Sequence, residues 1–374
     1  MRNQLAFTRF AAAARQIGAL VLGLVTYTLG PCLSASAQGT FTTFDAPGAV
    51  NGTFSEAINP EGTVTGYYRD ANSVSHGFAR APDGTFVTFD APGDVGGTSP
   101  SAMNSAGSIT GSFCGVGIAC EAFLRTTGGA FQAFYAPGAV FGTYPAGINS
   151  ASEIVGSYYD ANFVSHGFVR ASDGAITTFN APGAGTSSGG TYADGINPQG
   201  TVSGCYVDAN SVSHGFVAAK DGTLTRFDVP GSQGTGCFGL FIANVVAINP
   251  SGALTGGYFE PIEGNPFGGN WRGFLRAPDG TFTTFDAATG PCCIWTYGVA
   301  INSANGIAGY YNDGSDVNHG FLRASDGTVT ILAAPGAGTS AGQGTIADGI
   351  NPGGQITGYY TDGSDLSHGF VWTP

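Results

Sequence analysis

The chain has 374 residues, of which 42% are hydrophobic and 12% aromatic, so it is apolar enough to fold around a core rather than stay disordered. Its 12 basic and 25 acidic residues give a formal net charge of −13, and such a surface repels phosphate backbones and anionic membranes. We therefore expect no nucleic-acid partner. The 63 glycines beside only 10% charged residues predict many short strands joined by glycine-rich turns.

The first 37 residues have the pattern of a cleaved signal peptide. Three arginines precede an apolar run at 17–28, and Ala35-Ser36-Ala37 supplies the small residues before a cleavage site. The apolar run is short for a retained membrane anchor and ends at Gly30-Pro31. We expect residues 38–374 to be exported, to the periplasm or beyond the cell, without inserting into a membrane.

The exported part consists of seven copies of one repeat. Each copy contains an Ile-Asn pair, or Met-Asn in one copy, and the pairs lie 45 to 53 residues apart. From repeat 1 to repeat 7 the pairs are Ile58-Asn59, Met103-Asn104, Ile148-Asn149, Ile196-Asn197, Ile248-Asn249, Ile301-Asn302 and Ile350-Asn351. A period of about 40–50 residues with strand-like content is typical of β-propeller blades.

Each repeat is predicted to form four strands, a to d. In repeat 1 strand a ends at Ile58, strand b covers 63–68, strand c 76–80 and strand d 85–89. Repeat 7 stops after strand c, whereas the mature N-terminus begins with an unmatched strand d at 39–45. We therefore expect one all-β domain, a seven-bladed β-propeller of four-stranded blades in which the N-terminal strand completes the last blade and removes the open edge. A β-solenoid, the alternative, predicts capping repeats instead.

The repeat resembles the HAF-type extracellular repeats of exported bacterial proteins. In that family Gly-Ile-Asn and two further glycines precede a His-Ala-Phe triplet, and most copies here read His-Gly-Phe. The resemblance covers nearly all of the exported part. It implies export and a repeat architecture, and it implies no defined catalytic activity.

All five histidines lie in this triplet, each six residues after an aspartate. The pairs are Asp70 and His76, Asp160 and His166, Asp208 and His214, Asp313 and His319, and Asp362 and His368. Repeats 2 and 5 lack both members of the pair. We expect a structural unit in which the carboxylate accepts from the imidazole and holds the b–c loop. A catalytic base is needed only once, and metal ligands must converge on one ion, so five separate pairs suit neither role.

The most irregular loops are the b–c and d–a loops of repeats 4 to 6, which we expect on one face. Their aromatic and charged residues are Phe238, Phe241, Glu260, Glu263, Phe267, Trp271, Arg272, Trp295 and Tyr297. Exposed aromatic side chains stack on sugar rings or anchor protein partners, and variable loops on a rigid scaffold commonly bind ligands. The alternative is that these residues only pack beneath long loops.

A second group of candidates lies two residues before the Ile-Asn pair. Glu56, Asp194 and Asp348 occupy this position in repeats 1, 4 and 7, and we expect them at the mouth of a central channel. Carboxylates there can bind Ca²⁺ or act as acid and base, although solvated rim residues give the same pattern. No cofactor is required by the sequence. Asp-rich loops at 312–316 and 362–365 lack the EF-hand spacing, so we expect turns.

Six cysteines follow the predicted cleavage site, an even number that predicts disulfides in an exported protein. They are Cys114, Cys120, Cys205, Cys237, Cys292 and Cys293. Cys114 and Cys120 form the easiest local pair. The other four leave several connectivities open.

The sequence thus predicts a secreted, monomeric, non-enzymatic propeller that binds a protein or glycan through the loops of repeats 4 to 6, and it assigns no catalytic residue. One alternative is an extracytoplasmic carbohydrate-active hydrolase or lyase, which predicts a pocket that gathers Glu56, Asp194 or Asp348 with perturbed pKa values. A purely structural cell-envelope protein is the other alternative. A binding module predicts an exposed aromatic patch at Trp271 and Trp295.

Overall fold

The computed structural model of the protein describes residues 39–115, 119–187, 189–235, 237, 246–261, 269–288 and 295–374. Every regular element in this part of the chain is a β-strand. No helix that could cross a membrane occurs among these residues. All the strands belong to one compact unit, Ala35–Pro374. The predicted signal peptide lies outside the described residues.

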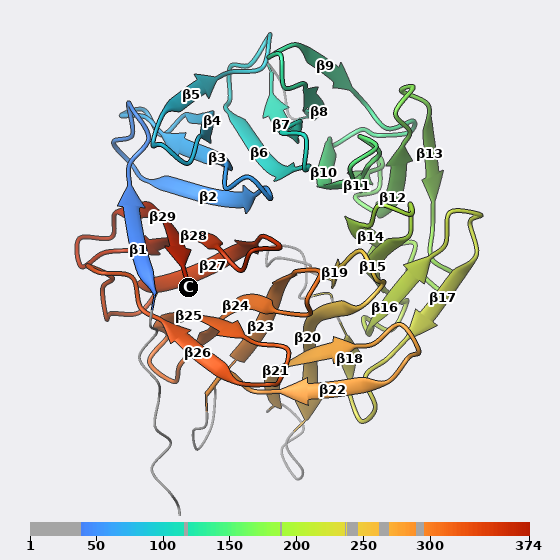
Figure 1. Cartoon of the computed structure of the whole chain (residues 1–374). Helices are drawn as coiled ribbons and strands as arrows, with labels where there is room; N and C mark the ends of the chain where they lie inside the picture. Colours follow the sequence, from blue (N-terminus) through green and yellow to red (C-terminus); the bar gives the residue numbers. More distant parts are fainter. Residues whose placement is uncertain are drawn as a thin grey trace, which may run out of the picture. The chain divides into compact units, whose positions relative to one another are not determined.

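Each repeat forms an antiparallel group of four strands, with a fifth strand in repeat 5, and these groups succeed one another along the chain (Figure 1). A single parallel pairing joins repeat 3 to repeat 4, at Ser165 and Gly190, and another joins repeat 6 to repeat 7, at Asn318 and Gly344. Repeat 1 contains β2 (Thr53–Ile58), β3 (Val64–Arg69), β4 (Ser75–Arg80) and β5 (Phe86–Phe89). Repeat 2 contains β6 (Thr98–Met103), β7 (Ile109–Cys114), β8 (Cys120–Arg125) and β9 (Phe131–Phe134). Repeat 3 contains β10 (Thr143–Ile148), β11 (Ile154–Tyr159), β12 (Ser165–Arg170) and β13 (Ile176–Phe179). Repeat 4 contains β14 (Gly190–Ile196), β15 (Val202–Val207), β16 (Ser213–Ala218) and β17 (Leu224–Phe227).

The same order continues in the second half of the chain. Repeat 5 contains β18 (Gly234–Thr235), β19 (Val246–Ile248), β20 (Leu254–Pro261), β21 (Gly269–Arg276) and β22 (Phe282–Phe285). Repeat 6 contains β23 (Trp295–Ile301), β24 (Ile307–Asn312), β25 (Asn318–Arg323) and β26 (Val329–Leu332). Repeat 7 contains β27 (Gly344–Ile350), β28 (Ile356–Thr361) and β29 (Ser367–Thr373), and its fourth strand is the N-terminal β1 (Thr40–Phe44).

The first and last described strands lie side by side (Figure 1). β1 pairs antiparallel with β29, from Thr40 opposite Thr373 to Phe44 opposite Gly369. Repeat 7 also contacts repeat 1 directly, because Asn351 Nδ2 donates to the carbonyl oxygen of Asn59 at 3.2 Å. The Ile-Asn asparagines of repeats 2, 3, 5 and 6 make the same bond to the asparagine carbonyl of the following repeat.

The core lies between consecutive sheets and is built from the phenylalanine of strand c. This side chain is fully buried in every repeat, at Phe78, Phe123, Phe168, Phe216, Phe274, Phe321 and Phe370. Phe78 meets Phe44 of β1 edge to face, with ring centroids 6.2 Å apart, and the Arg80 guanidinium lies 4.7 Å above the Phe44 ring. Burial of one such ring stabilises the fold by about 1.5–3 kcal/mol. The recurring phenylalanine therefore joins one sheet to the next.

Two disulfides occur in the described part of the chain. Cys114 and Cys120 close the β7–β8 hairpin, as the sequence predicts, and Cys205 of β15 joins Cys237. Cys292 and Cys293 lie outside the described residues. The bonds indicate an oxidising, extracytoplasmic compartment, because cytosolic thiols are kept reduced.

Candidate functional site

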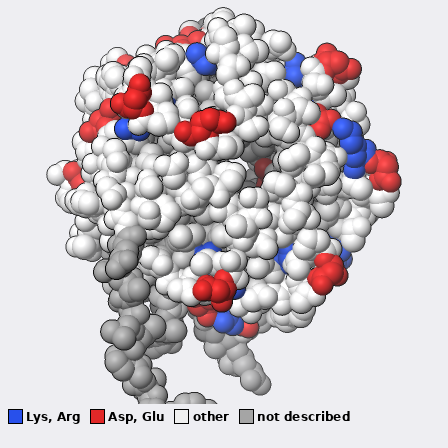
Figure 2. Space-filling view, viewed as in Figure 1, with Lys and Arg blue, Asp and Glu red and all other residues white. Residues whose placement is uncertain are grey.

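β-bulges place the three candidate carboxyl groups in a central cavity. In β2, Ser55 pairs with Gly66 and Ala57 with Thr65, so Glu56 is the extra residue of a bulge. Asp194 in β14 and Asp348 in β27 hold the same position. All three line a cavity of about 420 Å³, called here the inner cavity, whose other walls are mostly small and aliphatic. Figure 2 shows a hollow near the middle of the molecule with an acidic side chain inside it.

A glycine opposite each bulge makes this geometry possible. A Cβ atom at Gly66 would lie 2.0 Å from the carbonyl oxygen of Phe54, and one at Gly358 would lie 2.0 Å from that of Ile346. Both obstacles are backbone atoms, which cannot move aside. This is why strand b carries a glycine in every repeat.

Burial in the inner cavity raises the pKa of all three carboxyl groups. The pKa of Glu56 rises from 4.5 to about 7. Burial, and then the negative charge of Glu56, raise the pKa of Asp348 well above its ordinary value, and Asp348 Oδ2 is a buried atom without a hydrogen-bond donor among the described residues. Burial also raises the pKa of Asp194, while the Val246 N–H, 3.2 Å from Oδ2, partly offsets this rise. Glu56 can therefore exchange a proton near neutral pH.

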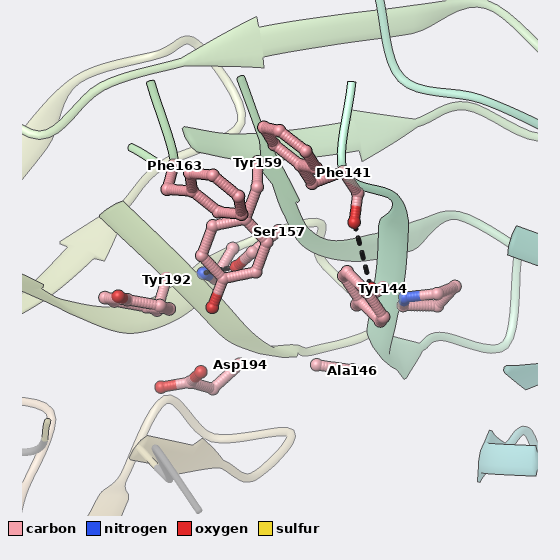
Figure 3. Close-up of a pocket in the computed structure, with 10 residues that line it drawn as sticks. Phe141, Tyr144, Ala146, Ser157, Tyr159, Phe163, Tyr192 and Asp194 are labelled. Carbon is pink, nitrogen blue, oxygen red and sulfur yellow. Dashed lines mark hydrogen bonds between the residues drawn. The ribbon is translucent and has the colours of Figure 1, made fainter. Parts of the chain in front are cut away.

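A second cavity, of about 590 Å³, lies at repeats 3 and 4 (Figure 3). We call it the aromatic pocket. Its aromatic lining residues are Phe141, Tyr144, Tyr159, Phe163 and Tyr192. Asp194 lines both the aromatic pocket and the inner cavity. The two cavities therefore share one carboxyl group.

The outer wall of the aromatic pocket is a stacked phenylalanine pair. Phe141, in the β9–β10 loop, and Phe163, in the β11–β12 loop, lie with ring centroids 3.7 Å apart and planes 12° from parallel. In repeat 1 the equivalent contact is polar, because Asn51 Nδ2 donates to Ser73 Oγ at 3.2 Å. The d–a loop thus meets the b–c loop in both repeats. The contact is aromatic in repeat 3 and polar in repeat 1.

Phe163 is an unusual residue for its backbone position. Its φ of 59° lies in the left-handed region, where a bulky side chain is strained, and its side chain is 61% exposed. The equivalent residues of other repeats are small or acidic: Ser73, Ser211, Asp316 and Asp365. The turn therefore does not require an aromatic residue at this position.

Tyrosines form the inner wall of the aromatic pocket. The Tyr144 hydroxyl donates to the carbonyl oxygen of Phe141 at 3.0 Å, the dashed bond in Figure 3. The rings of Tyr144 and Tyr159 meet edge to face at 5.9 Å, and the hydroxyls of Tyr159 and Tyr192 hydrogen-bond to each other. Burial raises the pKa of all three tyrosines, so they stay neutral. The pocket combines apolar ring faces with fixed hydroxyl groups.

The loop residues predicted in repeats 4 to 6 are only partly described. Phe238, Phe241, Glu263 and Phe267 lie outside the described residues. Trp271 packs against Phe259 with centroids 5.4 Å apart, Tyr297 packs against Tyr310 at 5.1 Å, and Trp295 is 39% exposed. None of these residues lines the aromatic pocket.

Arg272 and Glu260, two other predicted loop residues, belong to an ion-pair network. The Arg272 guanidinium donates to both carboxylate oxygens of Asp286, at 2.9 and 2.7 Å, and to Glu260 at 2.8 Å. These bonds raise the pKa of Arg272 further above its ordinary value. The side chain is therefore fixed by its own protein.

Arg272 occupies the position that histidine holds in five other repeats, where the contacts are similar. His76 Nδ1 lies 2.8 Å from Asp90 Oδ1 at the end of strand d, and Nε2 lies 3.8 Å from Asp70 Oδ2. Its ring stacks on Tyr68 at 5.1 Å. The strand-d partner, 14 residues after the histidine, was not predicted from the sequence. We call this arrangement a clamp: in repeat 1 it ties strand c to the end of strand d and to the start of the b–c loop, which supports a structural role.

The clamp recurs with different partners in the other histidine repeats. The strand-d partner is Asn180 for His166, Asp228 for His214 and Asp45 for His368. His319 instead contacts Asp313 at 3.0 Å. In repeat 2 Glu121 holds the histidine position and hydrogen-bonds to Tyr135. The position is thus filled by chemically different residues, which a shared catalytic role would not allow.

The described residues contain no group of three or more His, Cys, Asp or Glu side chains that could hold a metal ion. The Asp-rich loops form turns, as expected. In one of them Asp362 Oδ1 accepts from the backbone N–H groups of Ser364 and Leu366, at 2.7 and 3.0 Å.

Comparison with known proteins identifies the class of fold. No protein-family model matches the chain, and no curated protein matches its sequence. Among solved structures it is similar to a streptogramin B lyase, with a TM-score of 0.55 and 15% identity over 89% of this chain and 97% of the other. It is also similar to a catalytically inactive variant of virginiamycin B lyase from Staphylococcus aureus with quinupristin, with a TM-score of 0.56 and 14% identity over 90% of this chain and 100% of the other. At such identity the likeness concerns the fold alone. The repeated sheets and these neighbours define a β-propeller-like all-β protein.

Proposed function

We propose that the protein is an exported, monomeric, seven-bladed β-propeller of the HAF-type repeat family, with residues 1–37 removed as a signal peptide. The pairing of β1 with β29 and the bond from Asn351 to Asn59 support closure by the N-terminal strand. The two disulfides support export, because such bonds persist in oxidising compartments. The periplasm and the cell exterior both meet this requirement.

We further propose that the protein binds a glycan in the aromatic pocket. The observation that carries this proposal is the stacked Phe141–Phe163 pair beside a tyrosine-lined cavity of about 590 Å³. Small-molecule sites commonly have volumes of about 300–1,000 Å³ and combine apolar walls with a few polar groups. The C–H faces of a sugar can stack on the rings, while its hydroxyls bond to tyrosine hydroxyls and to Asp194. The predicted binding region therefore moves from repeats 4 to 6 to repeats 3 and 4.

A glycan array with the purified protein tests this function. The variant Phe141→Asn, Phe163→Ser replaces the stacked pair by the polar pair that repeat 1 already contains, so the loops can keep their contact. We expect glycan binding to weaken about tenfold or more, because two aromatic contacts of about 0.5–1.5 kcal/mol each are lost.

Trp295→Ala provides the matched control, because Trp295 is a partly exposed aromatic residue outside the pocket. This variant should bind as the unaltered protein does. Loss of binding in Trp295→Ala with full binding in the double variant would return the site to the loops of repeats 4 to 6. Absence of any glycan ligand would contradict the proposed function.

Acid–base catalysis on a glycan is the second candidate function, because the inner cavity gathers three carboxyl groups with raised pKa values. Glu56, with a pKa of about 7, can donate a proton at neutral pH. Incubation with the glycan that binds should then yield shorter products, and Glu56→Gln should abolish them while binding in the aromatic pocket persists. An intact glycan after prolonged incubation would exclude this function for that glycan.

A further inference from the structure

The described residues that line the two cavities include carboxyl groups and no basic side chain. Among the described residues, Asp194 is the only acidic one that lines the aromatic pocket, whereas Glu56 and Asp348 line the inner cavity together with it. No lysine, arginine or histidine lines either cavity among the described residues. A ligand that enters therefore meets carboxyl groups whose ionised form is poorly solvated and unpaired by the protein.

We infer that the glycan bound in the aromatic pocket is an amino sugar with a free, positively charged amino group. This inference rests on the proposed glycan-binding function and adds the chemical class of the ligand. In Figure 3 the Asp194 carboxyl group and the Tyr192 ring lie on the same side of the pocket. An ammonium group placed between them donates charge-assisted hydrogen bonds to the carboxylate and lies against an aromatic face.

The same arrangement discriminates against other sugars. A neutral sugar can hydrogen-bond to Asp194, but it leaves the buried carboxyl group in its protonated form, because burial raises the pKa of Asp194. A uronic or sialic acid brings an anion into a cavity that has no basic side chain among its described lining residues, so its charge stays uncompensated. An ammonium group stabilises the ionised form of Asp194 and gains a charge-assisted hydrogen bond from it. The pocket should therefore rank amino sugars above neutral sugars, and neutral sugars above acidic ones.

The backbone bond to Asp194 makes a clean variant possible. Val246 donates its N–H to Asp194 Oδ2 at 3.2 Å, and an asparagine carbonyl oxygen can accept the same bond. Asp194→Asn therefore removes the charge while it keeps the hydrogen bond and the size of the side chain. Asp173→Asn is the matched control, because Asp173 is an exposed turn residue that accepts a backbone bond from Ala175 and lines neither cavity.

The experiment is isothermal titration with two probes that differ only at the amino group, β-1,4-linked glucosamine oligosaccharides and their N-acetylated forms. We expect the free-amine probe to bind about tenfold or more tightly than the acetylated probe, since a hydrogen bond to a charged group contributes more than one to a neutral group. Asp194→Asn should abolish this preference and Asp173→Asn should retain it.

The outcomes separate this inference from the function on which it rests. Equal affinities for both probes, each lost in the Phe141→Asn, Phe163→Ser variant, would overturn the amino-sugar inference and leave glycan binding intact. A free-amine preference that persists in Asp194→Asn would also overturn it. If neither probe binds, the inference fails, and the glycan array alone decides the proposed function.

Discussion

Glu56 and Asp348 show how one extra residue per strand determines local chemistry. Each sits at a bulge of an inner strand, and the bulges of the neighbouring strands β2 and β27 bring the two carboxyl groups into one cavity. Their charges also act on the tyrosines nearby, since burial and the two carboxyl groups raise the pKa of Tyr67 to about 12. Burial and the mutual repulsion of the two charges disfavour full ionisation of the pair at neutral pH.

The raised pKa of Glu56 predicts a pH-dependent stability. In the unfolded chain Glu56 ionises near pH 4.5, whereas the native state retains its proton up to about pH 7. The native state binds more protons in this window, so its free energy of unfolding falls as the pH rises from 4.5 to 7, by about 1–3 kcal/mol from this group. Denaturant unfolding at pH 4.5 and at pH 7 measures this change. The free energy of unfolding should fall less in Glu56→Gln than in the unaltered protein. Glu61→Gln, at an exposed turn, is the control and should show the same fall in the free energy of unfolding as the unaltered protein. If Glu56→Gln also shows that same fall, the prediction is wrong.

At the scale of the element, each sheet combines a tight inner pair of strands with a clamped outer loop. The strand-b glycine lets strand a approach at the bulge, and the residue at the histidine position ties strand c to the end of strand d or to the b–c loop. The clamp tolerates histidine, arginine or glutamate, because only a bond across the loop is needed. Variation is thus concentrated in the loops, where repeat 3 carries its stacked phenylalanines.

The glycine requirement can be tested in repeat 7. Gly358→Ala places a Cβ atom 2.0 Å from a backbone oxygen, so we expect the free energy of unfolding to fall by about 2–3 kcal/mol. Gly363→Ala, in the adjacent b–c loop, meets nothing within 4 Å and should have little effect. Thermal unfolding of both variants measures the difference. Equal melting temperatures would show that strand a can move away from strand b.

For the whole molecule, the N-terminal strand β1 joins the first repeat to the last. β1 supplies Phe41, which packs on Phe370 at 5.4 Å, and Phe44, which packs on Phe78 of repeat 1. Asp45, just after β1, bonds to His368 of repeat 7 at 2.8 Å. One short strand thus contacts both the first and the last repeat.

Removal of this strand tests its contribution. A chain that starts at Ala46 loses Phe41 and Phe44, and we expect its free energy of unfolding to be lower by about 2–4 kcal/mol, since both rings are only partly buried. A chain that starts at Gln38 is the control and should retain the stability of the exported protein. Addition of a peptide of residues 38–46 should restore part of the loss. A truncated chain as stable as the control would argue against closure by β1.

Much of the fold was predictable from the sequence because its signals are local and repeated. The four-stranded all-β repeats agree with the sheets, and the boundaries differ by about one residue, as for strand b, predicted at 63–68 and observed as β3 at Val64–Arg69. The Cys114–Cys120 bond was predictable because the two cysteines are only six positions apart in the sequence, across a hairpin. Turn residues, strand periodicity and short-range pairing all act within about ten residues.

The aromatic pocket was not predicted, although a signal was present. Phe141 and Phe163 both depart from the repeat pattern, where Asn51 and Ser73 stand in repeat 1. Comparing the repeats position by position would have found each departure. It would not have shown that the two side chains stack, because they lie in different loops of the chain.

The sequence by itself determined the repeat, the strand order, the acidic character and the residues available for chemistry. Only the tertiary structure decided which of those residues meet. Asp194 joins two cavities, Glu56 lies beside Asp348 from the opposite end of the chain, and the phenylalanines of two loops form one wall. The physical reason is that bulge geometry and loop approach depend on the packing of strands far apart in the chain, which local periodicity does not encode.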